Sequence, residues 1–137
     1  MRKTTQHAPQ KSDAEKDRII AKAFWNMSEL YNFKKTEIAV LLGMNSQNPR
    51  NSIKSYQEKL TLPNNLDVKP RVGNLIAIHK CLRILFPMNP EVRYQWLREK
   101  RDLFEGKSAL EFITEDPDVS YDKLFLVRRI MDQLRGL

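Results

Sequence analysis

Apolar side chains recur at steps of three and four residues along most of this chain. The series Ile20, Phe24, Met27 and Tyr31 shows the spacing clearly. Such steps place side chains on one face of a helix, whereas a half-buried strand needs a period of two. No run combines strict alternation with β-branched residues, so no strand is predicted. The spacing therefore predicts an all-α fold.

Capping and helix-ending residues divide this pattern into seven predicted helices. Ser12 or Asp13 is a suitable N-cap for the first helix, and Gly43 ends the second because glycine readily adopts the left-handed conformation. Ser108 and Glu111 have the spacing of a capping box. The predicted helices start near residue 13, cover about 35–42, 50–60, 71–86 and 91–100, and start again at residues 108 and 120, with residues 62–70 as a connection.

The chain lacks the features of a membrane or secreted protein. Its longest apolar stretch, residues 72–86, contains four polar residues, and its N-terminus has no apolar segment of the signal-peptide type. A single cysteine excludes an internal disulfide. These observations predict a cytoplasmic protein with no membrane partner.

The positive charge is unevenly distributed along the chain. The formal net charge is +7, yet residues 1–89 hold 15 basic and 7 acidic side chains, whereas residues 90–137 hold 9 and 10. This asymmetry favours a part that faces nucleic acid, joined to a part with a different partner. A basic protein with a solvated tail is the alternative. Residues 1–12 are polar and basic, and they are predicted to form a disordered arm.

Residues Thr36 to Met44 have the pattern of the first helix and turn of a helix-turn-helix. Ala39 is small enough for close approach of the next helix, which would lie in the major groove. Ile53, the expected buried anchor of that helix, lies ten positions after Gly43, so the turn is enlarged. An ordinary helical hairpin remains the alternative. Arginine side chains can hydrogen-bond guanine, asparagine and glutamine can hydrogen-bond adenine, and lysine more naturally contacts phosphate. The predicted DNA-binding residues are therefore Arg50, Asn51, Lys54, Ser55 and Gln57.

A second motif begins with Trp96-Leu97 and continues as Leu103-Phe104-Glu105-Gly106-Lys107-Ser108-Ala109-Leu110-Glu111-Phe112-Ile113. This run resembles the C-terminal domain of Xre/MbcA/ParS-like antitoxins. Residues 71–78 are similar to the arginine-led helix that precedes that domain. The resemblance covers roughly residues 21–137, with Ala109 standing where the family commonly has proline.

The resemblance implies an Xre-like helix-turn-helix part over residues 13–65 and a toxin-binding helical part over 66–137. It implies a partner toxin, often of the NAD-consuming RES type, whose active site the antitoxin occludes. It also implies repression of the protein's own operon, with dimers or higher oligomers on operator DNA. The residues assigned to toxin binding are Trp96, Phe104, Gly106, Ser108, Arg128, Arg135 and Leu137. Plain core packing is the alternative for the large apolar members, and a solvated last turn for the C-terminal ones.

The sequence offers no catalytic site and implies no cofactor or metal. The two histidines are His7, in the basic arm, and His79, beside Lys80, while Cys81 has no evident base or metal partner. None of the glycines forms a phosphate-binding loop. A DNA-binding antitoxin is therefore the first hypothesis. A stand-alone helix-turn-helix regulator, whose C-terminal part only dimerises, is the alternative.

Overall fold

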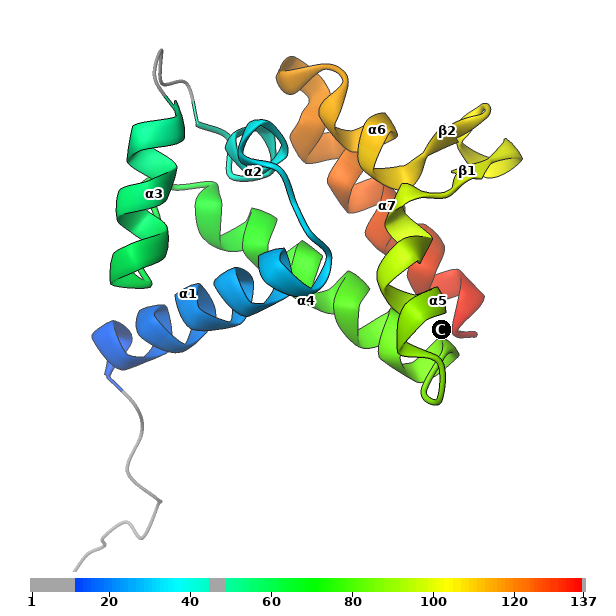
Figure 1. Cartoon of the computed structure of the whole chain (residues 1–137), viewed down its shortest axis with the longest axis horizontal. Coiled ribbons are helices and arrows are strands. Elements are labelled where there is room, and N and C mark those ends of the chain that lie inside the picture. The colour runs from blue at the N-terminus through cyan, green and yellow to red at the C-terminus, as the bar shows by residue number, and fades with distance from the viewer. Residues whose placement is uncertain (1–11, 45–48, 137) are drawn as a thin grey trace, which may run out of the picture.

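The computed structural model in Figure 1 describes residues 12–44 and 49–136. These residues form seven α-helices, three short 3-10 helices and a two-stranded antiparallel sheet, so the predicted all-α fold is confirmed. None of the described helices is long and apolar enough to cross a membrane. The elements are α1 (Asp13–Leu30), α2 (Lys35–Leu41), α3 (Pro49–Lys59), α4 (Val68–Leu85), α5 (Pro90–Gln95), η1 (Trp96–Arg98), β1 (Lys100–Arg101), η2 (Asp102–Phe104), β2 (Lys107–Ser108), α6 (Ala109–Thr114), η3 (Pro117–Val119) and α7 (Ser120–Leu134).

Helix α4 lies at the centre and packs against both α1 and α7 (Figure 1). Side-chain contacts join residue 71 to 120, 74 to 128 and 81 to 132, so α4 and α7 run in the same direction. Parallel neighbours need a long connection, and the smaller elements from α5 to η3 provide it. The buried apolar residues of α1, α2, α3, α4, α6 and α7 form one continuous cluster, so the N- and C-terminal parts share a core.

The helix predicted over residues 91–100 is wrong in its second half. Helix α5 ends at Gln95, and Lys100 pairs with Ser108 in the small sheet. Glu105 and Gly106 both have positive φ, at 58° and 83°, and turn the chain back on itself. The prediction of no strand is also wrong. Each of the two strands contains two residues, and such a short run cannot show alternation.

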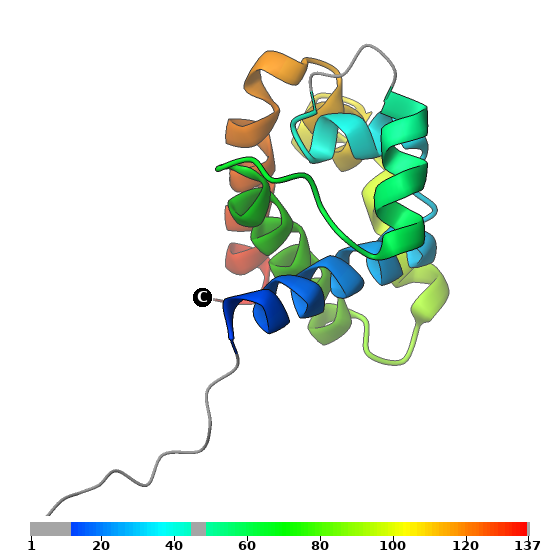
Figure 2. The same ribbon diagram turned by 90° about the vertical axis from the view of Figure 1, so that its left-hand side faces the viewer.

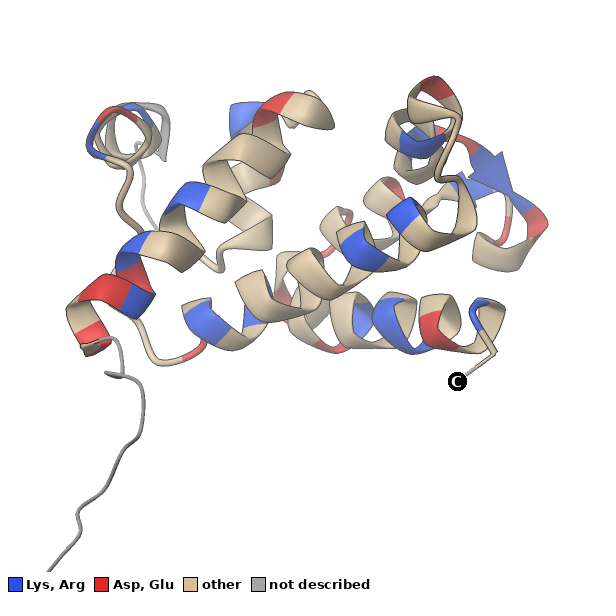
Figure 3. Cartoon of the chain, turned by 90° about the horizontal axis from the view of Figure 1, so that it is seen from below, with Lys and Arg blue, Asp and Glu red and all other residues tan. Residues whose placement is uncertain are grey.

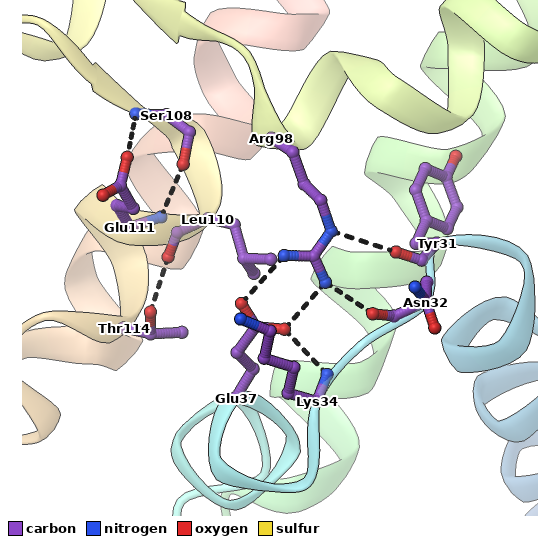
Figure 4. Close-up of polar contacts among 9 residues, drawn as sticks. All are labelled: Tyr31, Asn32, Lys34, Glu37, Arg98, Ser108, Leu110, Glu111 and Thr114. Atoms are coloured by element: carbon purple, nitrogen blue, oxygen red, sulfur yellow. Dashed lines mark hydrogen bonds and ion pairs between the residues drawn. The ribbon is translucent and has the colours of Figure 1, made fainter.

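Helix α4 begins at Val68, earlier than predicted, so the connection before it ends sooner. Pro70 lies in the first turn of α4, where a helix has no partner for the backbone N–H that proline lacks. Two predicted caps are confirmed. Ser12 accepts a hydrogen bond from the Glu15 amide, and Ser108 with Glu111 forms the capping box before α6 (Figure 4).

Candidate functional site

Helix α3 lies at one edge of the molecule and crosses α2 at a steep angle, as Figures 1 and 2 show together. Ile53 is fully buried, as predicted, and fastens α3 to the core. Gly43 has φ of +70°, which confirms the left-handed end predicted for the second helix. Seven residues separate α2 from α3, so the connection is longer than a simple helix-turn-helix requires. The arrangement nevertheless leaves the outer face of α3 accessible to a partner.

The predicted DNA-binding residues all fall on α3. Arg50 and Asn51 lie in its first turn, but their side chains are outside the described part of the structure. Lys54 is exposed, as a DNA-binding residue must be. Ser55 and Gln57 are half-buried, so only part of each side chain is accessible to DNA. Seen from below, basic segments also occur on α1 and α4 (Figure 3), so the positive charge is not confined to α3.

The N-terminal end of α2 is held by an arginine from the C-terminal part. The Arg98 guanidinium donates to both carboxylate oxygens of Glu37, at 3.1 and 2.8 Å (Figure 4). It also donates to the backbone oxygens of Tyr31 and Asn32 in the turn before α2. Glu37 in turn accepts the Lys34 amide at 2.7 Å. The two-point pairing fixes the angle of α2 as well as its position, because both donors lie in one rigid plane.

The C-terminal end of α2 is held by a second, buried arginine. Arg71 donates to the backbone oxygen of Val40 at 3.2 Å, to the Ser120 hydroxyl at 3.0 Å and to the Asp67 carboxylate at 3.0 Å. The last carbonyls of a helix lack intrahelical partners and carry partial negative charge, so a cation stabilises them. A Cβ on Gly43 would lie 2.7 Å from Arg71 Nε, so only glycine leaves room for this contact.

The turn between α1 and α2 is fixed by a buried tyrosine. The Tyr31 hydroxyl lies 2.8 Å from His79 Nδ1 on α4, and its ring also meets Tyr94 edge to face. Burial, with a smaller effect of Tyr94, raises the pKa of Tyr31 above its ordinary value. Burial, followed by the charges of nearby arginines on α4 and α5, lowers the pKa of His79. Both groups are therefore neutral at neutral pH, and the hydrogen bond joins two uncharged partners.

Several residues assigned to toxin binding are core residues of the C-terminal part. Trp96, Phe104 and Ser108 are each at most 5% exposed, which leaves them no surface for direct contact. The Trp96 ring meets Phe104 edge to face and carries the Arg101 guanidinium 4.1 Å above its centre. Gly106 forms the turn between the two strands. These residues build the segment from α5 to α6, in agreement with the core-packing alternative.

The assigned residues near the C-terminus are more accessible. Arg128 is half-buried and donates to the Asn74 side chain at 3.1 Å. Arg135 is exposed, and its guanidinium lies 3.8 Å from Cys81 Sγ. Burial raises the pKa of the Cys81 thiol, so the neutral form is favoured. Leu137 is outside the described residues.

An apolar groove lies beside these residues, where the ends of α4 and α7 meet the turn after β1. Its volume is about 420 Å³, and Leu103 and Leu134 on its rim are more than half exposed, at 54% and 52%. Its lining residues are Leu85, Phe86, Trp96, Arg101, Leu103 and Leu134. The sequence pattern did not predict the groove, although Leu103 belongs to the motif that covers residues 96–113. Exposed leucines around a hollow are typical of a protein-binding surface.

No protein-family model matches the chain, and no solved structure matches it. The uncharacterized protein y4oB of Sinorhizobium fredii is 29% identical over 125 residues, which is 91% of each chain. A match of this length includes both the α2–α3 region and the segment from α5 to α6. Within residues 12–44 and 49–136, no group of three metal-ligating side chains is present.

Proposed function

We propose that this protein is the antitoxin of a type II toxin–antitoxin pair, which binds its operator through α3 and its toxin through the C-terminal part. The observation that carries the proposal is the combination of two surfaces on one core. One is the outer face of α3, and the other is the groove rimmed by Leu103 and Leu134. The resemblance of residues 96–113 to Xre/MbcA/ParS-like antitoxins supports the assignment of the second surface to a toxin, with a RES-type enzyme as the expected class.

The DNA side of the proposal rests on the charge and position of α3. Lys54 and Lys59 are exposed on this helix, and basic side chains outnumber acidic ones two to one in residues 1–89. Exposed lysines on a helix that can enter the major groove are suited to phosphate contacts. Repression of the operon then follows from occupation of the promoter.

The toxin side is tested by co-expression with the product of the neighbouring gene. The wild-type chain is expected to form a complex that survives purification and to restore growth. Leu103→Asp with Leu134→Asp is expected to abolish both, because charges in a desolvated apolar contact are strongly unfavourable. Leu66→Asp is the matched control, because Leu66 is fully exposed on the α3–α4 connection. Rescue by the groove variant as strong as that by the control would contradict the proposed surface.

The DNA side is tested by titrating promoter DNA at several salt concentrations. Arg50→Ala with Lys54→Ala is expected to weaken binding and to reduce the slope of log K against log salt by about 0.9 per lost phosphate contact. Lys80→Ala is the control, since Lys80 is also exposed but lies on α4. An unchanged slope in the α3 variant would place the DNA-binding face elsewhere.

A stand-alone regulator is the second candidate, and one observation favours it. Phe125 and Leu126 on α7 are large apolar side chains that are 45% and 46% exposed, and a second copy of the chain could cover them. This candidate predicts promoter binding by a dimer, without any complex with the neighbouring gene product. Co-expression with the neighbouring gene product, described above, therefore separates the two functions.

A further inference from the structure

A cavity of about 620 Å³ lies between α1, the α3–α4 connection and the start of α4. It is separate from the groove rimmed by Leu103 and Leu134, and it adjoins α3 through Lys59. Its volume falls within the range of about 300–1,000 Å³ found for small-molecule sites. Its floor is apolar and contains the buried residues Ala21, Pro63 and Val68. The described residues therefore line a partly open hollow of the size and polarity that suit an organic molecule.

The rim of this cavity is positively charged. Arg18, Lys59 and Lys69 line it together with a single acidic residue, Asp17. Asp17 is already paired with Lys69, with Nζ and Oδ1 2.7 Å apart. Among residues 12–44 and 49–136, no acidic side chain pairs with Arg18 or Lys59. Two cations thus stand beside an apolar floor with no described counter-charge.

The wall formed by the α3–α4 connection is held in place from within the core. Trp25 is 2% exposed, and its Nε1 donates to the backbone oxygen of Thr61 at 2.8 Å. Leu60, the residue before Thr61, has a positive φ of 52°, which turns the chain at the end of α3. The amides of Asn64 and Asn65 add neutral hydrogen-bonding groups to the lining. The cavity is therefore formed before any ligand arrives.

We propose that this cavity binds a small amphipathic anion, with an apolar body on the floor and a carboxylate, phosphate or sulfonate against Arg18 and Lys59. The apolar floor alone attracts an uncharged hydrocarbon, and the two cations add the preference for negative charge. Because the wall continues directly from α3, a bound molecule contacts the segment that follows the proposed DNA-binding helix. The binding itself does not depend on the proposed function.

The first test uses two fluorescent probes that differ in one group. 8-Anilinonaphthalene-1-sulfonate is an amphipathic anion, and N-phenyl-1-naphthylamine has the same rings without the sulfonate. Saturable sulfonate binding to the wild-type chain is expected. In Arg18→Gln with Lys59→Gln, the Kd for the sulfonate should rise about tenfold or more, while the uncharged probe is unaffected. Absence of sulfonate binding, or an equal change for both probes, would overturn the proposal.

Two further variants separate this cavity from other apolar surfaces. Ala14→Trp places a large side chain in the lining from the exposed first turn of α1, and it should block the sulfonate without removing a charge. Leu103→Asp, in the other groove, should leave binding unchanged. If Leu103→Asp abolished sulfonate binding and Ala14→Trp left it unchanged, the site would lie in that groove and the assignment would be wrong.

A carboxylate or phosphate can come from a free molecule or from a lipid headgroup. Sedimentation with phosphatidylglycerol vesicles distinguishes the two sources. A site for a free small molecule predicts that the wild-type chain does not sediment with the vesicles. Sedimentation that is lost in Arg18→Gln with Lys59→Gln would show a membrane-binding surface instead of a small-molecule site.

Discussion

Helices α2 and α3 follow one another in the chain, yet the rest of the molecule holds them in different ways. The seven residues of α2 are fixed at both ends, by Arg98 through Glu37 and by Arg71 through the Val40 carbonyl. In α3, by contrast, Ile53 is fully buried and the other described side chains are half-buried or exposed. The difference shows that α2 is a structural support, whereas α3 presents a surface whose residues are not needed for the core.

The largest expected effect is at the C-terminal end of α2. Arg71→Ala removes a buried cation that donates to the Val40 carbonyl, the Ser120 hydroxyl and the Asp67 carboxylate. Hydrogen bonds to a charged group are worth about 1.5–3 kcal/mol each, and the remaining bonds of Val40 to Gly43 and of Ser120 to Pro117 offset only part of the loss. We expect the free energy of unfolding in urea to fall by about 3 kcal/mol or more. Arg83→Ala, at an exposed position on the same helix, should change it by less than about 0.5 kcal/mol. Equal effects would show that α2 does not depend on Arg71.

The next effect concerns the glycine that admits Arg71. Gly43→Ala combines the strain of a left-handed alanine, about 1–2 kcal/mol, with displacement of the guanidinium from its partners. Gly106→Ala carries the strain alone, because its Cβ would meet open space. Thermal unfolding measures the loss of stability in each variant. The difference between the two losses is the cost of the contact between the added Cβ at position 43 and the Arg71 guanidinium. Equal losses of stability in Gly43→Ala and Gly106→Ala would mean that Arg71 moves away from the added Cβ at no cost in stability.

A smaller effect is expected at the N-terminal end of α2. A double-mutant cycle with Arg98→Ala and Glu37→Gln should give a coupling of about 1–2 kcal/mol, because the pair is two-point and mostly buried. The same cycle on Lys107 and Glu115, which are more exposed, should give a smaller coupling, because solvent screens an exposed ion pair. A coupling no larger than that of the surface pair would show that Arg98 and Glu37 do not stabilise the N-terminal end of α2, so that only Arg71 holds this helix.

The smallest effect is a pH dependence at the turn before α2. The pKa of His79 is lower in the folded chain than its ordinary value of 6.5, so the unfolded chain binds the proton more readily. This contribution to stability is complete above pH 6.5 and is lost as the pH falls through the lower folded pKa. His79→Gln can still accept the Tyr31 hydroxyl but does not titrate, so its urea midpoint should vary less with pH in this window. Parallel pH profiles for the two chains would exclude His79 as the source.

Most helices were predictable because their signals are local. The three- and four-residue spacing locates the apolar faces, and Ser12, Gly43 and the Ser108–Glu111 pair mark boundaries that the structure confirms. The errors fall where local signals compete with distant contacts. Lys100 continues a helical pattern, but its backbone pairs with Ser108 across a turn, a contact no helical period encodes.

The candidate site was less predictable than the fold. Arg71 and Arg98 have the same side chain as the exposed Arg83, and only contacts 31 and 61 residues away along the chain decide their roles. Trp96 and Phe104 carry the resemblance to a toxin-binding domain, yet they are buried. The exposed neighbours Leu103 and Leu134 form the accessible surface, and they become neighbours only after α4 and α7 have packed together.

The proposed function requires one rigid core that carries a DNA-binding helix and a separate partner-binding groove. The most direct test is an electrophoretic mobility shift with the chain's own promoter, first with this protein alone and then with the neighbouring gene product added. We expect a first shift with the protein alone and then a slower band that contains all three molecules. Leu103→Asp with Leu134→Asp should remove the slower band and keep the first shift. A first shift with no slower band would identify a stand-alone regulator, and no shift at all would contradict the assignment of α3 to DNA.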